Sequence, residues 1–344
     1  MIQRLLIVAA VAAFAACVAS SAQAQPANKV QLRGSLDFVR YGANAPYDHA
    51  AAQGYFAQYG LEVAFDAAKG SQDSVARVAS GVYDFGVADF PTLIQFVALH
   101  PEGPKAVFIV IDESPLSVVS LKTANIRKPA DLVGRTLAMA ETEGGSRLFP
   151  AFMKANGLSD TQVERKIIDV RLRDTMLLRG GVDAVIGNNY TVLFNLKGLG
   201  VPPENLSFLN YAENGLDLYG QGIIVRRALI EQNPEAVRGF VRAAARAWRE
   251  AVVDTRPAIQ SIFKMDGTLN VDLEADRLRW FIDHTVVTPN TRRNGIGSYD
   301  PVRLKHNVEI VSTGLALPRT PDVAEVFDER FLPPPGERTL PAGK

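Results

Sequence analysis

The sequence predicts an α/β protein made of two domains with mostly parallel sheets. Strand-like apolar segments alternate with helix-like segments of roughly ten residues through most of the chain, which is typical of βαβ units. Hydrophobic residues make up 47% of the 344 positions, enough for an extensive apolar core. A single core stops growing beyond about 250–300 residues, so a chain of this length is expected to divide in two.

The first residues predict an export signal. Arg4 precedes an apolar run from Leu5 to Ala19, and Ala22-Gln23-Ala24 follows. A charged start, a short apolar segment and an A-x-A site are typical of a secretory signal peptide, so we expect residues 1–24 to be removed and the protein to lie in the periplasm. Phe14-Ala15-Ala16-Cys17 also resembles a lipid-attachment sequence, which leaves a lipoprotein anchored through Cys17 as an alternative.

Charge and cysteine content exclude several classes of function. The 37 basic and 37 acidic residues balance without a long run of one sign, so no nucleic-acid partner is predicted. Cys17 is the only cysteine and falls in the predicted signal, which excludes disulfides and cysteine nucleophiles from the mature protein. The four histidines lack metal-ligand spacing, and no metal or cofactor is predicted.

The predicted elements follow in order. Pro46 is tolerated in the first turn of a helix, and Gly60 supplies the left-handed residue that ends one, which bounds a helix over 45–59. Gly81 ends a second helix in the same way. The expected strands are 30–38, 61–68, 83–87, 105–112, 117–122, 135–140, 163–170, 182–186 and 222–226, and the expected helices are 72–80, 92–99, 146–156, 174–178, 190–196, 233–254, 256–264, 270–285 and 300–313.

Two segments rich in turn-forming residues divide this series. They lie at 112–117 and 218–222, and we expect the chain to cross between two domains at each. The prediction is a second domain, residues 116–220, inserted into a first domain of residues 27–115 plus 221–340. The tail from Leu332 to Gly336, with three consecutive prolines, is expected to be extended on the surface.

Four sequence landmarks resemble those of a known family. "GYFAQYGLEV", "SGVYDFGVAD", "IRKPADLVGRTLAM" and "GVDAVIG" are similar, in order and spacing, to landmarks of the periplasmic substrate-binding proteins of ABC importers. The branch is the one that binds nitrate, taurine or other sulfonates, and thiamine-pyrimidine precursors. "LDF" followed by "NAPYDHAAAQGYF" is most similar to the pyrimidine-precursor group, which usually has Trp in place of Phe38 and His in place of Asn44. The match extends from residue 30 to about residue 260.

The resemblance implies a two-domain periplasmic-binding-protein fold of the type II-like kind, with two crossing strands as hinge. It also implies a monomer that holds one small-molecule ligand between its domains and delivers it to an ABC permease in the inner membrane. In open α/β sheets, ligands bind beyond the carboxyl ends of the strands, where helix N-termini converge. The first turn of the helix 45–59 is therefore expected to face the ligand.

Six candidate ligand-binding residues follow the first and third strands. Aromatic rings and polar tips suit a flat organic ligand, whereas Asn and Asp at helix starts are also common caps, an alternative that stays open for Asn44 and Asp89. The six residues are Asp37, Phe38, Tyr41, Asn44, Asp89 and Phe90.

Six further candidates come from the inserted domain. In "AETEGGSR", Gly144 and Gly145 allow close backbone approach, and a helix start with free N–H groups favours an electron-rich ligand group. Glu141 instead suits a ligand N–H, and the alternative for Ser146 is a helix cap. Asn188 and Tyr190 follow the strand "DAVIG" and complete the set.

The sequence thus predicts an exported solute-binding protein that closes around a small polar organic ligand, which is pyrimidine-like, a carboxylate or a sulfonate. An exported enzyme on the same fold, with Glu141 or Asp89 as acid/base group, is the competing hypothesis. A sensor that passes a signal to a membrane receptor would use the same residues.

Overall fold

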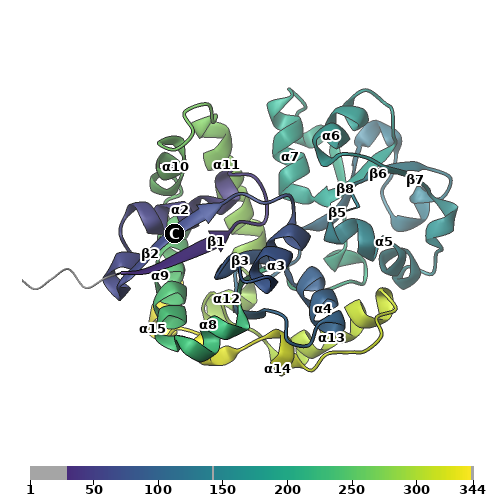
Figure 1. The fold of residues 1–344 in the computed structure, drawn as a ribbon. Helices are drawn as coiled ribbons and strands as arrows, with labels where there is room; N and C mark the ends of the chain where they lie inside the picture. The colour runs from purple at the N-terminus through teal and green to yellow at the C-terminus, as the bar shows by residue number, and fades with distance from the viewer. Residues whose placement is uncertain (1–28, 142, 342–344) are drawn as a thin grey trace, which may run out of the picture.

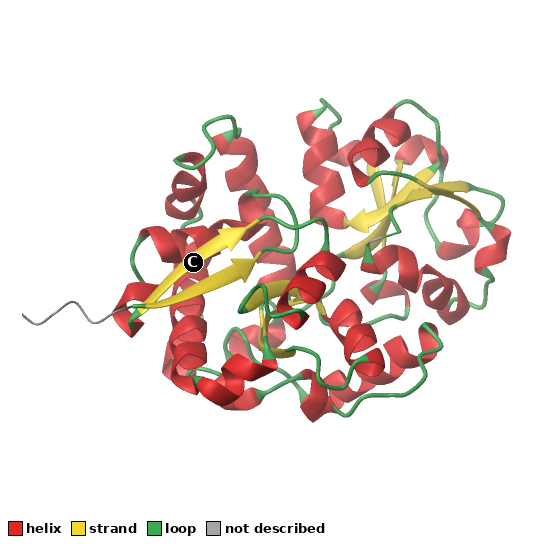
Figure 2. Ribbon diagram, in the orientation of Figure 1, coloured by secondary structure: helices red, strands yellow, loops and turns green. Residues whose placement is uncertain are grey.

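The computed structural model describes residues 29–141 and 143–341, so the predicted signal and Cys17 lie outside the described residues. Two five-stranded sheets lie side by side, each flanked by helices (Figures 1 and 2). The strand orders are β2-β1-β3-β10-β4 and β7-β6-β8-β5-β9. We call the parts built on these sheets the first lobe and the second lobe. The presence of two such sheets, each flanked by helices, confirms the predicted two-part α/β fold.

Each sheet has four strands in one direction and one strand that runs against its neighbours. In the first lobe that strand is β10, and in the second lobe it is β5. Both follow directly after the chain has crossed from the other lobe. A strand that enters a sheet from outside needs no crossover helix, so it can pair antiparallel where βαβ connections force the other strands to be parallel.

The first lobe comprises the start and the end of the described chain. Its strands are β1 (Val30–Ser35), β2 (Leu61–Asp66), β3 (Phe85–Asp89), β4 (Lys105–Ile109) and β10 (Gln221–Val225). Its helices are α2 (Ala45–Ala52), α3 (Ser71–Ala79), α4 (Phe90–Leu99), α8 (Arg227–Gln232), α9 (Pro234–Val253), α10 (Arg256–Phe263), α11 (Val271–Phe281), α12 (Pro289–Asn294), α13 (Pro301–Gly314), α14 (Val323–Val326) and α15 (Pro335–Arg338).

The second lobe is formed by the middle of the chain. Its strands are β5 (Leu116–Leu121), β6 (Thr136–Met139), β7 (Glu164–Ile167), β8 (Ala184–Asn188) and β9 (Leu206–Asn210), and its helices are α5 (Gly144–Ala155), α6 (Val170–Leu178) and α7 (Asn189–Gly198). Strand β9 was not predicted, because its five residues mix apolar and polar side chains and are only partly buried at a sheet edge.

Several predicted boundaries were wrong: the strands predicted over 30–38 and 105–112 end three residues early, and the helix predicted over 174–178 begins at Val170. Three further differences have local reasons. The helix predicted over 45–59 ends at Ala52, because Gly54 adopts a left-handed conformation (φ 68°); only a short 3₁₀ turn precedes Gly60 (φ 69°). The strand predicted over 163–170 ends at Ile167, since Asp169 caps α6 through a hydrogen bond from the Arg171 amide. The proline-rich tail, predicted to be extended, contains the helical turn α15.

Two crossing segments join the lobes, namely residues 110–115 and 211–220. They run side by side: the Ser114 amide donates to the Leu218 carbonyl at 3.0 Å, and the Gly220 amide donates to the Ile111 carbonyl at 2.9 Å. A side chain on Gly220 would collide with Ile111, at 2.3 Å from its Cγ2 atom. Glycine is therefore required where the two segments touch. No helix of the described residues is long and apolar enough to cross a membrane.

Candidate functional site

A cleft between the two lobes brings together the ends of several strands and the starts of the helices that follow them. It encloses about 720 Å³ of space, part of which is open to solvent. The starts of α3, α4, α5, α6 and α7 all contribute lining residues, and so do both crossing segments. This is the edge at which ligands bind in open α/β sheets, because free helix N–H groups and strand ends meet there.

The predicted residues after β1 form one wall of the cleft. Asp37, Phe38 and Tyr41 all line it, and the Phe38 and Tyr41 rings meet edge to face with centroids 6.3 Å apart. Such a pair presents both an apolar ring and a polar hydroxyl to a ligand. The Tyr41 hydroxyl lies 3.0 Å from the Tyr190 hydroxyl, which belongs to the second lobe. Burial raises the pKa of both phenols, so each remains protonated.

Asp37 is the most unusual charged group in the cleft. Its side chain is buried; Oδ2 accepts a hydrogen bond from the Gln221 amide, and Oδ1 has no hydrogen-bond partner. Burial raises the pKa of this carboxyl to about 6. The Gln221 and Asn44 amides oppose that rise, although the hydrogen bond of the Asn44 amide goes to the Val39 carbonyl at 3.3 Å. An unpartnered buried oxygen that lines a cleft is a site for a ligand donor.

Asp89 caps a helix and faces the other lobe. Its Oδ1 atom accepts a hydrogen bond from the Thr92 amide at 2.7 Å, which is the capping alternative for this residue. A Cβ atom on Gly144, at the start of α5 in the second lobe, would lie only 3.0 Å from the same oxygen. The two lobes therefore approach at this point, and the approach depends on a glycine.

Arg173 fixes the charged group at the start of α5. Its guanidinium is fully buried, and its Nη1 atom donates to the Glu143 carboxylate at 2.7 Å and to the Ile186 carbonyl at 3.1 Å. Its Nε atom donates to Asp174 at 2.9 Å. A side chain on Gly187 would lie 2.4 Å from Arg173 Nη1, so the bare Gly187 backbone covers the guanidinium where it lines the cleft. Glu143 therefore lines the cleft with its carboxylate paired to the Arg173 guanidinium.

Seven of the twelve predicted ligand-binding residues line the cleft and five do not. Those that line it are Asp37, Phe38, Tyr41, Asp89, Gly144, Gly145 and Asn188. Phe90 is buried against the Tyr219 and Phe327 rings, and Tyr190 lies behind Tyr41. Asn44 is buried behind Asp37, without a side-chain cap of α2.

The remaining two predictions place the helix start incorrectly. Glu141 is exposed and does not line the cleft. Glu143, the residue before the first turn of α5, lines it instead. Ser146 was expected as a cap or a ligand contact, but α5 begins at Gly144, and the Ser146 hydroxyl is buried without a hydrogen-bond partner. The error arises because two glycines are poor helix formers, so the pattern places the start two residues too late.

Several lining residues were not predicted. Lys69, Gly70 and Ser71 lie at the start of α3, directly after β2, and the rule that identified the other helix starts could have found them. Ser114, Pro115, Leu116, Gly220 and Gln221 come from the crossing segments and the strands they enter, while Val170 and Thr191 come from α6 and α7. Within residues 29–141 and 143–341, no cluster of three or more His, Cys, Asp or Glu could hold a metal ion.

The lobes are also in contact outside the residues that line the cleft. Arg147 of α5 donates to the Gln95 side-chain oxygen and, at 2.6 Å, to the Thr92 hydroxyl, both on α4. On the other side, Lys197 of α7 pairs with Asp276 of α11 at 2.6 Å. Together with the Tyr41–Tyr190 contact, these bonds define a closed arrangement.

Comparison with known proteins places the chain among ligand-binding proteins. A family model described as NMT1/THI5 like matches residues 43–257. The chain is 26% identical over 332 residues to the riboflavin-binding protein RibY of Chloroflexus aurantiacus, which covers 93% of this chain and 91% of RibY. It is 24% identical over 230 residues to a formylaminopyrimidine-binding protein of Halalkalibacterium halodurans (65% of this chain, 67% of that protein).

Two further proteins bear on fold and activity. A 4-amino-5-hydroxymethyl-2-methylpyrimidine phosphate synthase of Legionella pneumophila is 22% identical over 285 residues, which covers 81% of this chain and 85% of the synthase. The solved structure of the alkanesulfonate-binding protein SsuA from Xanthomonas axonopodis pv. citri, bound to MOPS, superposes with a TM-score of 0.67 at 16% identity. It covers 88% of this chain and 99% of SsuA, which identifies the fold as that of a periplasmic binding protein.

Proposed function

Because the chain belongs to the NMT1/THI5-like family, we propose that it is a solute-binding protein that captures a small polar organic molecule for an ABC permease in the inner membrane. The observation that carries the proposal is the cleft to which helix starts from both lobes and both crossing segments contribute. A monomer in the periplasm would suffice for this function, since one chain supplies both walls of the cleft.

The ligand class is inferred from the three carboxylates that line the cleft; Lys69 also lines it but is exposed to solvent. Asp37 has an oxygen without a partner, whereas Glu143 is paired with Arg173 and Asp89 is engaged as a cap. A sulfonate or carboxylate would add negative charge next to Asp37, in a buried place where like charges repel strongly. A neutral or cationic nitrogen heterocycle could instead donate an N–H to Oδ1 and lie against Phe38 and Tyr41. The relatives named for riboflavin and formylaminopyrimidine bind compounds of this class.

Closure of the lobes is the proposed mechanism. A ligand held by residues of both lobes binds the closed arrangement better than the open one, and that difference in affinity shifts the population towards closure. The contacts of Arg147 with α4 and of Tyr41 with Tyr190 would form only when the lobes approach. The ligand is then enclosed until the permease separates the lobes.

We propose binding without turnover. One relative of this chain is named as a synthase, so the two carboxylates considered as acid/base groups are discussed separately. Glu141 is exposed outside the cleft, and Asp89 is occupied by the Thr92 amide. Glu141 therefore does not face a molecule bound in the cleft, and Asp89 has a structural role as a helix cap, so we assign catalysis to neither. Recovery of a bound compound unchanged after prolonged incubation is the expected result.

The test is a binding series followed by scattering. Riboflavin, formylaminopyrimidine and MOPS would each be titrated into the mature protein by calorimetry, and native mass spectrometry would identify any co-purified molecule. We expect a heterocycle to bind far more tightly than MOPS and to reduce the radius of gyration in solution scattering. Tight binding of MOPS alone would refute the proposed ligand class, and ligand binding without compaction would refute closure.

A further inference from the structure

Helix α13 lies behind the hinge and contacts both lobes. It packs against α4 of the first lobe and α5 of the second (Figure 1). Its apolar residues Leu304 and Val308 belong to the same buried cluster as Phe149 of α5. At its end, a Cβ atom on Gly314 would lie 2.7 Å from the Cβ atom of Ala151, so the two helices are in close contact. A change in the angle between the lobes would therefore alter the contacts of α13 with α4 or with α5.

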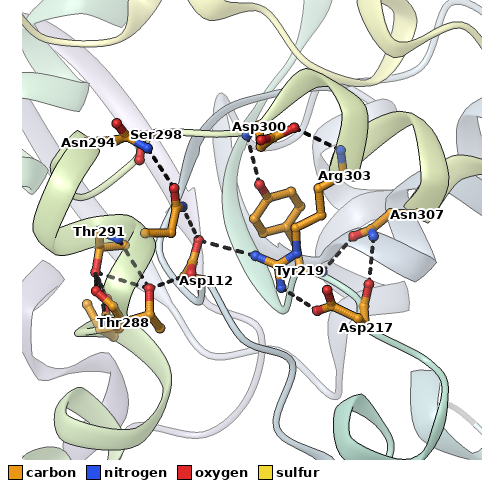
Figure 3. A network of polar contacts seen from close by, with 12 residues as sticks. Asp112, Asp217, Tyr219, Thr288, Thr291, Asn294, Ser298, Asp300, Arg303 and Asn307 are labelled. Atoms are coloured by element: carbon orange, nitrogen blue, oxygen red, sulfur yellow. Dashed lines mark hydrogen bonds and ion pairs between the residues drawn. The ribbon is translucent and has the colours of Figure 1, made fainter.

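Arg303 of α13 connects the two crossing segments. Its Nη2 atom lies 2.7 Å from Asp217 in the second crossing, and its Nη1 atom lies 3.5 Å from Asp112 in the first (Figure 3). The guanidinium carbon also lies 4.2 Å from the centre of the Tyr219 ring. One planar side chain with five N–H donors can hold two carboxylates in fixed directions, which a lysine could not do.

Asn307, one turn later on α13, holds the backbone of the second crossing. Its Oδ1 atom accepts a hydrogen bond from the Tyr219 amide at 2.6 Å, and its Nδ2 atom donates to the Asp217 carbonyl at 2.8 Å (Figure 3). The side chain is fully buried. The Asp300 amide, at the start of α13, donates to the Tyr219 hydroxyl at 2.8 Å. The second crossing is thus attached to α13 at three points.

The first crossing is attached to the same part of the chain. Asp112 is buried and accepts hydrogen bonds from the Thr288 hydroxyl at 2.5 Å and the Asn290 amide at 2.7 Å. Its own backbone amide donates to the Thr285 carbonyl at 2.9 Å. The residues that line the cleft follow within a few positions: Ser114 after Asp112, and Gln221 after Tyr219. Movement of either crossing therefore displaces a wall of the cleft.

We propose that Arg303 and Asn307 are positioning residues that hold the two crossing segments in the closed arrangement and so set ligand affinity without touching the ligand. The proposal rests on the proposed function where it concerns affinity, but the population of the closed arrangement in the ligand-free protein can be measured without any ligand. Arg303 contacts a carboxylate in each crossing segment, so a rotation of the lobes that moves Asp217 relative to Asp112 would weaken these bonds. A bond present only in the closed state increases its population, and apparent affinity rises with that population.

The test is Arg303→Gln, measured with and without ligand. We expect the ligand-free variant to have a larger radius of gyration than the wild type and the dissociation constant for riboflavin to rise about three- to thirtyfold. Arg256→Gln is the matched control, because Arg256 is exposed and pairs with Asp254 next to it in the same lobe. The control should change neither quantity by more than about twofold, as expected for an exposed pair.

A second variant tests the proposal in case Arg303→Gln does not fold. Asp217 is 61% exposed in its side chain, so Asp217→Asn removes one arm of the Arg303 contact with little risk to the fold. We expect the same direction of change, but smaller. If both variants keep the wild-type radius of gyration and affinity, the proposal is overturned. If wild-type protein binds none of the tested compounds while Arg303→Gln still opens the free protein, the proposed function fails and this inference stands.

Discussion

Asp37 and Asp112 are both buried carboxylates next to the crossing segments, with side chains that differ little in exposure, yet their surroundings are opposite. Asp112 receives donors on both oxygens, from Thr288 and Asn290, and lies near Arg303. Asp37 receives one donor, from Gln221, and its second oxygen receives none. We infer from this difference that Asp112 stabilises the hinge, whereas Asp37 can accept a hydrogen bond from a ligand.

Physical chemistry explains why the two cases have different consequences. A buried carboxylate with all its acceptors occupied stabilises the fold, and the loss of one partner leaves a buried group unsatisfied. A buried carboxylate with one unpartnered oxygen destabilises the free protein, and a ligand donor removes that penalty on binding. Substitution at the two positions should therefore change stability in opposite directions.

The largest expected effect is the loss of stability in Asp112→Asn. The new amide has no charge and only one acceptor oxygen. It therefore either turns its NH2 group towards the Asn290 and Arg303 donors or loses the acceptor for the Thr288 hydroxyl, and in both cases the free energy of unfolding should fall by about 2–3 kcal/mol. Urea unfolding at pH 7 measures the change. Glu235→Gln, at an exposed pair with Arg238, is the control and should differ from wild type by less than about 0.5 kcal/mol. An unchanged midpoint in Asp112→Asn would remove the contrast between the two carboxylates.

Asp37→Asn should weaken ligand binding without weakening the fold. The loss of a hydrogen bond to a charged acceptor corresponds to a rise of roughly ten- to a hundredfold in the dissociation constant for riboflavin. At pH 7, the unfolding free energy of the ligand-free variant should equal or exceed that of the wild type, because a buried charge has been removed. Calorimetric titration gives the affinity, with Glu62→Gln on the surface of β2 as control. Unaltered affinity would show that Asp37 faces no ligand donor.

The pH dependence of stability gives a third measurement on the same carboxyl. Its pKa in the folded protein is raised to about 6 by burial, above the ordinary value of 3.8. The folded state therefore binds this proton more tightly than the unfolded state, and the contribution to stability increases as pH falls. Between pH 7 and pH 5 the wild type should gain about 1 kcal/mol relative to Asp37→Asn. If the free energy of unfolding changed with pH in the same way in both proteins, the Asp37 carboxyl would be exposed to solvent rather than buried.

The local parts of this structure were predictable from the sequence. Alternating strands and helices identified the two-part α/β fold, and Gly60 was correctly expected in a left-handed conformation. The lining residues found in advance, such as Asp37 and Asp89, directly follow strands or begin helices. A rule about strand ends needs only the order of elements along the chain, and the sequence contains that order.

The parts that depend on contact between the lobes were not predictable. Tyr190 was expected to face the ligand, but its hydroxyl meets that of Tyr41 from the other lobe. Glu143 was overlooked in favour of Glu141, because the two glycines hid the true start of α5, whose Gly144 lies against Asp89 of the other lobe. The ion pairs of Arg303 join residues that lie 86 or more positions apart, and no local pattern indicates which carboxylates a distant arginine will reach.

The smallest expected effect concerns Ser146. This residue tests whether an unpartnered buried group binds a ligand only where it lines the cleft. Its hydroxyl, like Asp37 Oδ1, is buried without a hydrogen-bond partner, but it does not line the cleft. Ser146→Ala should leave riboflavin affinity unchanged and raise the free energy of unfolding by no more than about 1 kcal/mol, since an unsatisfied polar atom is removed inside a helix that alanine favours. Parallel calorimetry and urea unfolding test both parts. A tenfold loss of affinity would mean that the α5 start turns further towards the ligand than this closed arrangement shows, and that a missing partner alone does not distinguish the two kinds of buried group.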